Sequence, residues 1–109
     1  LTRFEELLRD YFTSDKPQSL GLPSVAWCAD RLHLSANYFG DLIKKETGKS
    51  AQEYIQLTTI DRAKELLTEG GRSVSEIAYE LGFKYPHHLS RLFKKVVGYT
   101  PNEYKTLSA

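Results

Sequence analysis

The side chains best suited to chemistry in this sequence are its histidines, its single cysteine and a group of clustered cations. His87 and His88 are neighbours, so on a helix they project about 100° apart, whereas paired metal ligands lie at i and i+4 on one face. Cys28 is the only cysteine, which excludes an internal disulfide, and its position between Trp27 and Ala29 is typical of a small core residue. The sequence has no glycine-rich phosphate loop and no Ser/His/Asp constellation, so we expect no enzyme activity, no metal and no cofactor.

The clustered cations lie near the C-terminus. Between Glu80 and Glu103 there is no acid, and this stretch contains Lys84, Arg91, Lys94, Lys95 and the two adjacent histidines. The rest of the chain holds the other 11 of the 15 cations and all 14 acids. The net charge is only +1, so the bulk charge does not identify a polyanionic partner. A run of charges alone is most simply a solvated helix face. Whether it is a nucleic-acid-binding patch instead depends on the elements that carry it.

Length and composition set the scale of those elements. The chain has 109 residues, of which 40% are hydrophobic and 27% charged, and this is typical of one compact globular domain. No stretch approaches the ~20 apolar residues that span a bilayer, and the start lacks the apolar region of a signal peptide, so we expect a cytoplasmic protein. Because the chain does not begin with Met, we expect it to be part of a longer protein.

Apolar residues recur three and four apart throughout the chain, which predicts an all-α fold of about seven helices. The first helix is expected at residues 3–12, followed by a polar, breaker-rich connection at residues 15–23. Three capping boxes then mark helix starts, formed by Ser50 with Glu53, Ser73 with Glu76, and Thr100 with Glu103. Glycines mark the helix ends, namely Gly48, Gly70, Gly71 and Gly98.

The chain contains an internal repeat. Ser24-Val25 matches Ser73-Val74, and after a one-residue insertion near a turn, Leu42-Ile43 matches Leu92-Phe93. Each copy is a short helix (24–32; 74–81), a tight turn and a longer helix (36–47; 86–97), the helix-turn-helix pattern whose second helix can enter the DNA major groove.

A linking helix at residues 51–67 is expected to join the two copies. At ~1.5 Å per residue it would be about 26 Å long, comparable with the ~34 Å between successive major grooves. Its apolar residues are predicted to pack against both units, namely Tyr54, Leu57, Ile60, Ala63, Leu66 and Leu67.

A helical wheel sorts the second helix of each copy into two faces. In the second copy, Leu89, Leu92, Phe93 and Val96 form the predicted core stripe, and Arg91 lies near the centre of the opposite arc. Arginine there can donate two hydrogen bonds to guanine, and lysines suit phosphate. The predicted DNA-contacting residues are Asn37, Tyr38, Asp41, Lys44 and Lys45 in the first copy and Lys84, Tyr85, His87, His88, Ser90, Arg91, Lys94 and Lys95 in the second.

The two outward faces differ in chemistry. Asn37 suits adenine, but Asp41 stands where Arg91 stands in the second copy. Asp41 would either accept a hydrogen bond from a cytosine amino group, or face the phosphates as a like charge, or be neutralised by a neighbouring lysine.

The ordered pattern Ile77-Ala78, Gly82-Phe83, Leu89-Ser90-Arg91-Leu92-Phe93-Lys94-Lys95, Gly98, Thr100-Pro101 and Tyr104 resembles the DNA-binding domain of the AraC/XylS family of bacterial transcription regulators. The resemblance covers about residues 22–104. It implies a helix and connection at residues 1–22, then a double helix-turn-helix domain at 23–109, with units at about 23–49 and 72–109 and a linking helix at 50–69. The sequence departs from the family at Gln56, Thr58 and Thr59, where basic residues are frequent.

The resemblance also implies partners. These are double-stranded DNA, RNA polymerase in the intact regulator, and a sensor or dimerisation domain on the N-terminal side of this segment. A helical protein-interaction module that has lost DNA binding is the alternative hypothesis, favoured by Asp41 and by the small net charge. The salt dependence of binding to DNA separates the two hypotheses.

Overall fold

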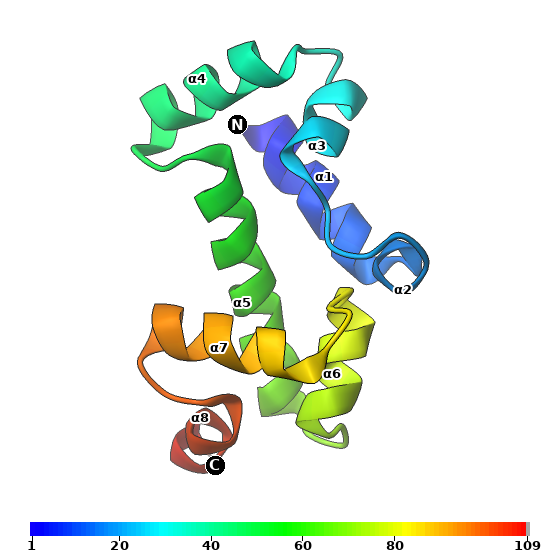
Figure 1. Ribbon diagram of the computed structural model, residues 1–109, viewed down its shortest axis with the longest axis vertical. Helices are drawn as coiled ribbons and strands as arrows, with labels where there is room; N and C mark the ends of the chain where they lie inside the picture. Colours follow the sequence, from blue (N-terminus) through cyan, green and yellow to red (C-terminus); the bar gives the residue numbers. More distant parts are fainter. Residues whose placement is uncertain (109) are drawn as a thin grey trace.

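The computed structural model describes residues 1–108, and the regular structure in that range is entirely α-helical (Figure 1). Its eight helices are α1 (Thr2–Thr13), α2 (Lys16–Leu20), α3 (Val25–Arg31), α4 (Ala36–Thr47), α5 (Ala51–Glu69), α6 (Val74–Leu81), α7 (Pro86–Val97) and α8 (Pro101–Ser108). The all-α prediction is confirmed. The two predicted helix-turn-helix units are α3 with α4 and α6 with α7, and α5 joins them.

The structure has one helix more than the about seven expected, because the predicted connection at residues 15–23 contains the short helix α2. Pro17 lies in its first turn, where a missing N–H removes no hydrogen bond, and Gly21 ends it with a φ of 86°. The proline and polar residues that indicated a breaker are therefore the residues that begin a one-turn helix.

The three predicted capping boxes are confirmed. Ser50 Oγ accepts from the Glu53 N–H at 3.1 Å, while the Ser50 N–H donates to Glu53 Oε1 at 3.3 Å. The same reciprocal bonds join Ser73 with Glu76 and Thr100 with Glu103. Capped in this way, α5 runs for 19 residues, two more than expected, and is about 28 Å long at ~1.5 Å per residue.

Two hydrophobic cores lie along α5, one for each unit. The first-unit core contains Phe4, Leu8, Cys28, Ala29, Phe39, Ile43, Ala51 and Ile55. The second-unit core contains Tyr11, Phe12, Ile60, Ala63, Leu66, Leu67, Ile77, Ala78, Leu81, Phe83, Leu89 and Phe93. Helix α1 supplies residues to both cores, and Trp27 packs against both. The first helix thus ties the two units together along α5.

The repeat seen in the sequence is a repeat in structure. The Leu34 N–H donates to the Ala29 carbonyl and the Phe83 N–H to the Ala78 carbonyl, both at 2.9 Å. The turn residue of each unit has a positive φ, 60° at His33 and 101° at Gly82. Residues 41–50 and 91–100 also share one pattern of burial, position by position. The two units therefore fold alike.

Gly82 is held against the chain that precedes the first unit. A Cβ at this position would lie 2.6 Å from the Gly21 carbonyl carbon and 2.8 Å from the Leu22 nitrogen. The turn of the second unit thus contacts the backbone between α2 and α3 directly, which only glycine allows.

Two core assignments made from the sequence are wrong. Val96 is 37% exposed, and its neighbour Val97 packs against the second-unit core instead. On α5, Leu57 is half-buried and belongs to neither core, whereas Ile55 is buried in the first-unit core. Both errors are at the edge of an apolar stripe, where the packing partner decides which neighbour turns inward.

Candidate nucleic-acid interface

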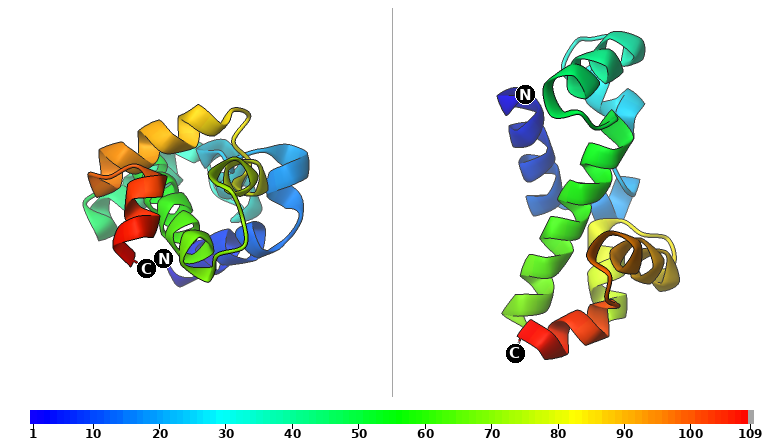
Figure 2. Two further views of the ribbon diagram at one scale, coloured as in Figure 1. Left: turned by 90° about the horizontal axis from the view of Figure 1, so that it is seen from below. Right: turned by 90° about the vertical axis from the view of Figure 1, so that its left-hand side faces the viewer.

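The second helices of the two units, α4 and α7, are the elements expected to meet DNA. Both run across the view of Figure 1, α4 at the start of α5 and α7 partway along it. Figure 2 shows α1 on the side of α5 away from α7. The face that carries α7 is therefore separate from the face covered by the first helix.

Burial of the core stripes fixes which sides of these helices remain open. Leu89 and Phe93 of α7 are buried, as are Phe39 and Ile43 of α4. Of the thirteen predicted contact residues, twelve are exposed, and Ser90 alone is half-buried. The outward orientation predicted from the wheel is confirmed for the ten of them that lie on α4 and α7. Lys84 and Tyr85 precede α7 and are exposed as well, and contact of all twelve with DNA stays a prediction.

The start of α7 carries a cluster of aromatic and imidazole rings. The Tyr85 ring stacks on His87 at 5.7 Å between centroids and meets His88 edge-on at 5.5 Å, and the two histidine rings are 4.4 Å apart. Lys84 Nζ lies 5.6 Å from the Tyr85 ring centroid. The structure thus brings four of the predicted residues together, with polar tips exposed to solvent.

The exposed cations of α7 have no acidic partner among residues 1–108. The ion pairs in that range join Arg62 with Glu65, and Arg72 with Glu69 and Glu80, and the N-terminal amine with Glu46. Arg91, Lys94 and Lys95 are absent from this set. Their charges are therefore available to an external anion.

The face of α4 offers fewer available positive charges than the face of α7. Lys44 Nζ donates to the Gly48 carbonyl at 3.0 Å, so this ammonium is already bound at the C-terminal end of its own helix. Asp41 is exposed and makes no ion pair with any residue of the described range, so neutralisation by a neighbouring lysine is not seen. Tyr38, 57% exposed, presents a large ring beside it.

The first acid after α7 in the sequence, Glu103, is held in a cap. A hydrogen bond from the Thr100 backbone, followed by one from its side chain, lowers the pKa of Glu103, and the charge of Lys94 adds to this effect. The pKa values of Glu53 and Glu76 are lowered by the equivalent hydrogen bonds from Ser50 and Ser73. These carboxylates are thus committed to helix starts.

Cys28 offers no nucleophile. Its side chain is fully buried in the first-unit core, and burial raises the pKa of its thiol to about 11.

Residues 1–108 also contain no group of three or more His, Cys, Asp or Glu side chains placed to hold a metal ion. None of the helices in the same range combines the length and the apolarity needed to cross a bilayer.

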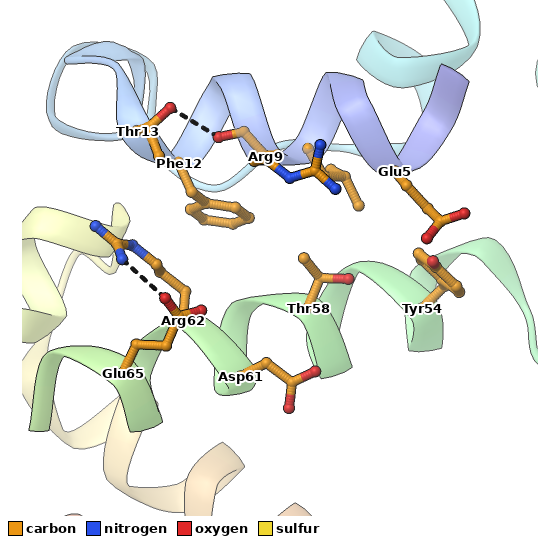
Figure 3. Close-up of a pocket in the computed structure, with 10 residues that line it drawn as sticks. Glu5, Arg9, Phe12, Thr13, Tyr54, Thr58, Asp61, Arg62 and Glu65 are labelled. Carbon is orange, nitrogen blue, oxygen red and sulfur yellow. Dashed lines mark hydrogen bonds and ion pairs between the residues drawn. The ribbon is translucent and has the colours of Figure 1, made fainter. Parts of the chain in front are cut away.

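A groove of about 460 Å³ lies between α1 and α5, on the side of α5 away from α7 (Figure 3). Arg9, Glu5 and Asp61 line it, and Arg62 Nη1 donates to Glu65 Oε2 at its rim at 3.2 Å. Acids and arginines alternate along this groove, and its lining contains neither histidine nor cysteine. It therefore has no set of groups suited to acid–base or nucleophilic catalysis.

A smaller hollow of about 200 Å³ adjoins α7 on the other side of α5. Its polar lining is Gln52, Gln56 and Thr59 of α5, with His88 of α7. The sequence reasoning included His88 but neither glutamine. Three segments far apart in the chain build this hollow, so no local pattern signals it.

Comparison with known proteins gives one family. A family profile described as a helix-turn-helix domain matches residues 28–106. The transcriptional regulatory protein YesN of Bacillus subtilis is 40% identical over 91 residues, which are 79% of this chain. The chain spans only 25% of the length of that relative.

Two solved structures are similar over nearly the whole chain. The C-terminal domain of AraT, a response regulator from Geobacillus stearothermophilus, has a TM-score of 0.82 at 26% identity, covering 97% of this chain and 83% of that one. A transcriptional regulator with an AraC-type DNA-binding domain from Chromobacterium violaceum has a TM-score of 0.84 at 23% identity, covering 100% of this chain and 91% of that one.

Proposed function

This chain belongs to the AraC-type helix-turn-helix family of DNA-binding transcription regulators, and from that premise we propose that it is the DNA-reading domain of a longer bacterial regulator. The observation that carries the proposal is the pair of exposed polar helix faces, on α4 and α7, held by one continuous helix. Each face would enter one of two successive major grooves of a duplex.

The dimensions support this placement. Helix α5 is about 28 Å long, and the domain measures 40 Å along its longest axis. Successive major grooves on one side of B-DNA are about 34 Å apart. The length of α5 is therefore of the same order as the spacing of successive major grooves.

The roles of the residues follow from their chemistry. Arg91, exposed near the centre of the α7 face, would donate two hydrogen bonds to a guanine edge, and Asn37 would pair with adenine. Lys94 and Lys95 would bind phosphates without reading sequence. The ring cluster at the start of α7 would meet the backbone or a base edge where the helix enters the groove.

The rest of the regulator lies outside this chain. We propose that a sensor or dimerisation domain precedes it, that the intact protein contacts RNA polymerase, and that it acts in the bacterial cytoplasm. A regulator that works by binding DNA requires no catalytic residue, which agrees with the buried Cys28 thiol.

Salt titration on DNA tests the proposal. The 109-residue chain is mixed with a labelled random-sequence duplex pool and with a duplex selected from it, and affinity is measured by fluorescence anisotropy as salt rises. We expect affinity to fall steeply with salt on both, and hydroxyl-radical footprinting to show two protected patches about one turn apart on the selected duplex. Weak binding that does not depend on salt would support the protein-interaction module instead.

A further inference from the structure

The hollow beside α7 lies between the two proposed reading faces. Gln52 is four residues past Gly48, where α4 ends, and His88 belongs to the exposed face of α7. Gln56 lines the same hollow, one helical turn along α5 from Gln52. We call these three residues the saddle. It continues the α7 face toward the α4 face.

The saddle has hydrogen-bonding capacity that the protein does not use. In the first half of α5, the side-chain hydrogen bonds within residues 1–108 are made by Glu53, to Ser50, and by Thr59. The Thr59 hydroxyl donates to the Ile55 carbonyl at 2.7 Å and is buried beneath the hollow. Each glutamine amide offers two N–H donors and a neutral imidazole offers one, and these remain free for an external acceptor.

The floor of the hollow is apolar and its lining carries no acid. Its apolar lining is Leu22, Pro23 and Leu92, together with the buried side chains of Ile55 and Phe83. Because the lining contains no carboxylate, nothing there repels a phosphate. An apolar floor with neutral donors at its rim suits deoxyribose and phosphate oxygens respectively.

We propose that the saddle is a third DNA contact, in which Gln52, Gln56 and His88 hold the sugar-phosphate backbone between the two major grooves through uncharged hydrogen bonds. The proposal rests on the proposed function. Two helices in successive major grooves on one face of a duplex enclose the intervening minor groove and its flanking backbones, and the saddle is the surface presented to that stretch. Neutral donors add affinity there without adding salt dependence.

Adding a charge to the saddle tests its contact with phosphate. Gln56→Lys, and Gln52→Lys at the more exposed position, each place an ammonium there. On a duplex of about 30 base pairs, selected by the wild-type chain from a randomised pool, each variant should steepen the plot of log affinity against log salt by about 0.9. Gln18→Lys is the matched control, because Gln18 lies on α2 beside Arg72 and Tyr79, outside the saddle. Its slope should equal that of the wild type.

Removing the donors gives a second readout. Gln52→Ala combined with Gln56→Ala should lower affinity about ten-fold, the loss expected for one or two hydrogen bonds, with the slope unchanged. Circular dichroism confirms that each variant is helical. If both lysine variants give the slope of Gln18→Lys, or the double alanine variant binds as tightly as the wild type, the proposed contact between the saddle and DNA is wrong. The proposed function then still stands. If the wild-type chain itself shows no salt-dependent binding to duplex DNA, both proposals are wrong.

Discussion

At the residue scale, Arg91 and its lysine neighbours provide a direct test of base reading against backbone binding. Arg91 is exposed and makes no ion pair within the described range, so its guanidinium is free to bind a guanine edge. Arg91→Ala should cost about 1–3 kcal/mol on the selected duplex and relax the preference at one base pair. Lys94→Ala is the comparison, and it should weaken binding to selected and random duplexes alike. Equal losses on both duplexes for Arg91→Ala would place Arg91 on the backbone.

Gly82 supports a prediction about stability. Its φ of 101° is a conformation that costs a side-chain-bearing residue about 1–2 kcal/mol, and a Cβ would also overlap the backbone at Gly21 and Leu22. Gly98 has a similar φ of 92°, but no atom lies within 4 Å of its Cβ position. Gly82→Ala should therefore lower the free energy of unfolding more than Gly98→Ala, by an excess of about 1–3 kcal/mol for the overlap, as measured by urea denaturation. Equal losses would mean that the contact with Gly21 contributes nothing.

At the scale of single elements, the three capping boxes link stability to pH. Hydrogen bonding lowers the pKa of Glu53, Glu76 and Glu103 from the ordinary value of 4.5. A carboxyl whose pKa is lower when folded stabilises the protein above its unfolded pKa, and this contribution is lost as pH falls through the folded value. The stability that the three caps contribute is therefore lost at pH values below about 4.5.

Glutamine can replace glutamate in a capping box but does not titrate. A variant with Gln at all three positions should lose less stability than the wild type when the urea midpoint is compared between about pH 6 and about pH 3. The other carboxyl groups are common to both proteins, so the difference isolates the caps. The same acid loss in both proteins would show that the caps do not carry this dependence.

Those capped starts are also the part of the fold that the sequence predicted best. A capping box is a local signal, since a hydroxyl and a carboxylate three residues apart satisfy each other whatever surrounds them. The bounds predicted for α4 and α7 agree with the structure for the same reason, because a cap or proline begins each helix and a glycine ends it. Helix α2 was missed because one turn is too short to show a hydrophobic period.

The features that the sequence did not predict depend on the packing of helices that are far apart in the chain. Val97 packs against the second-unit core in place of Val96, and Tyr104 of α8 packs against the same core from another part of the chain. For the candidate interface, the wheel predicted which side of α7 is exposed. It could not predict that Lys44 binds the end of its own helix, or that α5 glutamines line a hollow beside His88. Such contacts are set by tertiary packing and have no pattern in one segment.

At the scale of the whole molecule, the two reading faces should contribute unequally to affinity. The α7 face offers unpaired Arg91, Lys94 and Lys95, whereas Lys44 is bound to Gly48 and Asp41 opposes the phosphates. Lys94→Ala with Lys95→Ala should flatten the plot of log affinity against log salt by up to about 1.8, at 0.9 for each phosphate contact. The pair Lys44→Ala with Lys45→Ala should flatten it less, and an equal or larger effect would contradict the asymmetry.

Asp41→Asn separates the remaining roles of that residue. If Asp41 only repels phosphate, the variant should raise affinity for random duplex at low salt, because a like charge has been removed. A loss of affinity for the selected duplex, with random duplex unchanged, would instead make Asp41 a reader of cytosine. Both affinities come from one anisotropy titration.

The packing of α1 into both cores has a consequence for the DNA itself. With Phe4 and Leu8 in one core, Tyr11 and Phe12 in the other, and Trp27 against both, the two units cannot slide apart. One base pair inserted between the half-sites displaces the second by about 3.4 Å and turns it by about 35°, and the packing that α1 and Trp27 share between both cores opposes a matching movement of one unit. Such an insertion should reduce affinity to that of a single half-site, and retained affinity in a binding assay would reveal a hinge. During evolution, single base pairs of the DNA site can therefore change, whereas the number of base pairs between its two half-sites must stay constant.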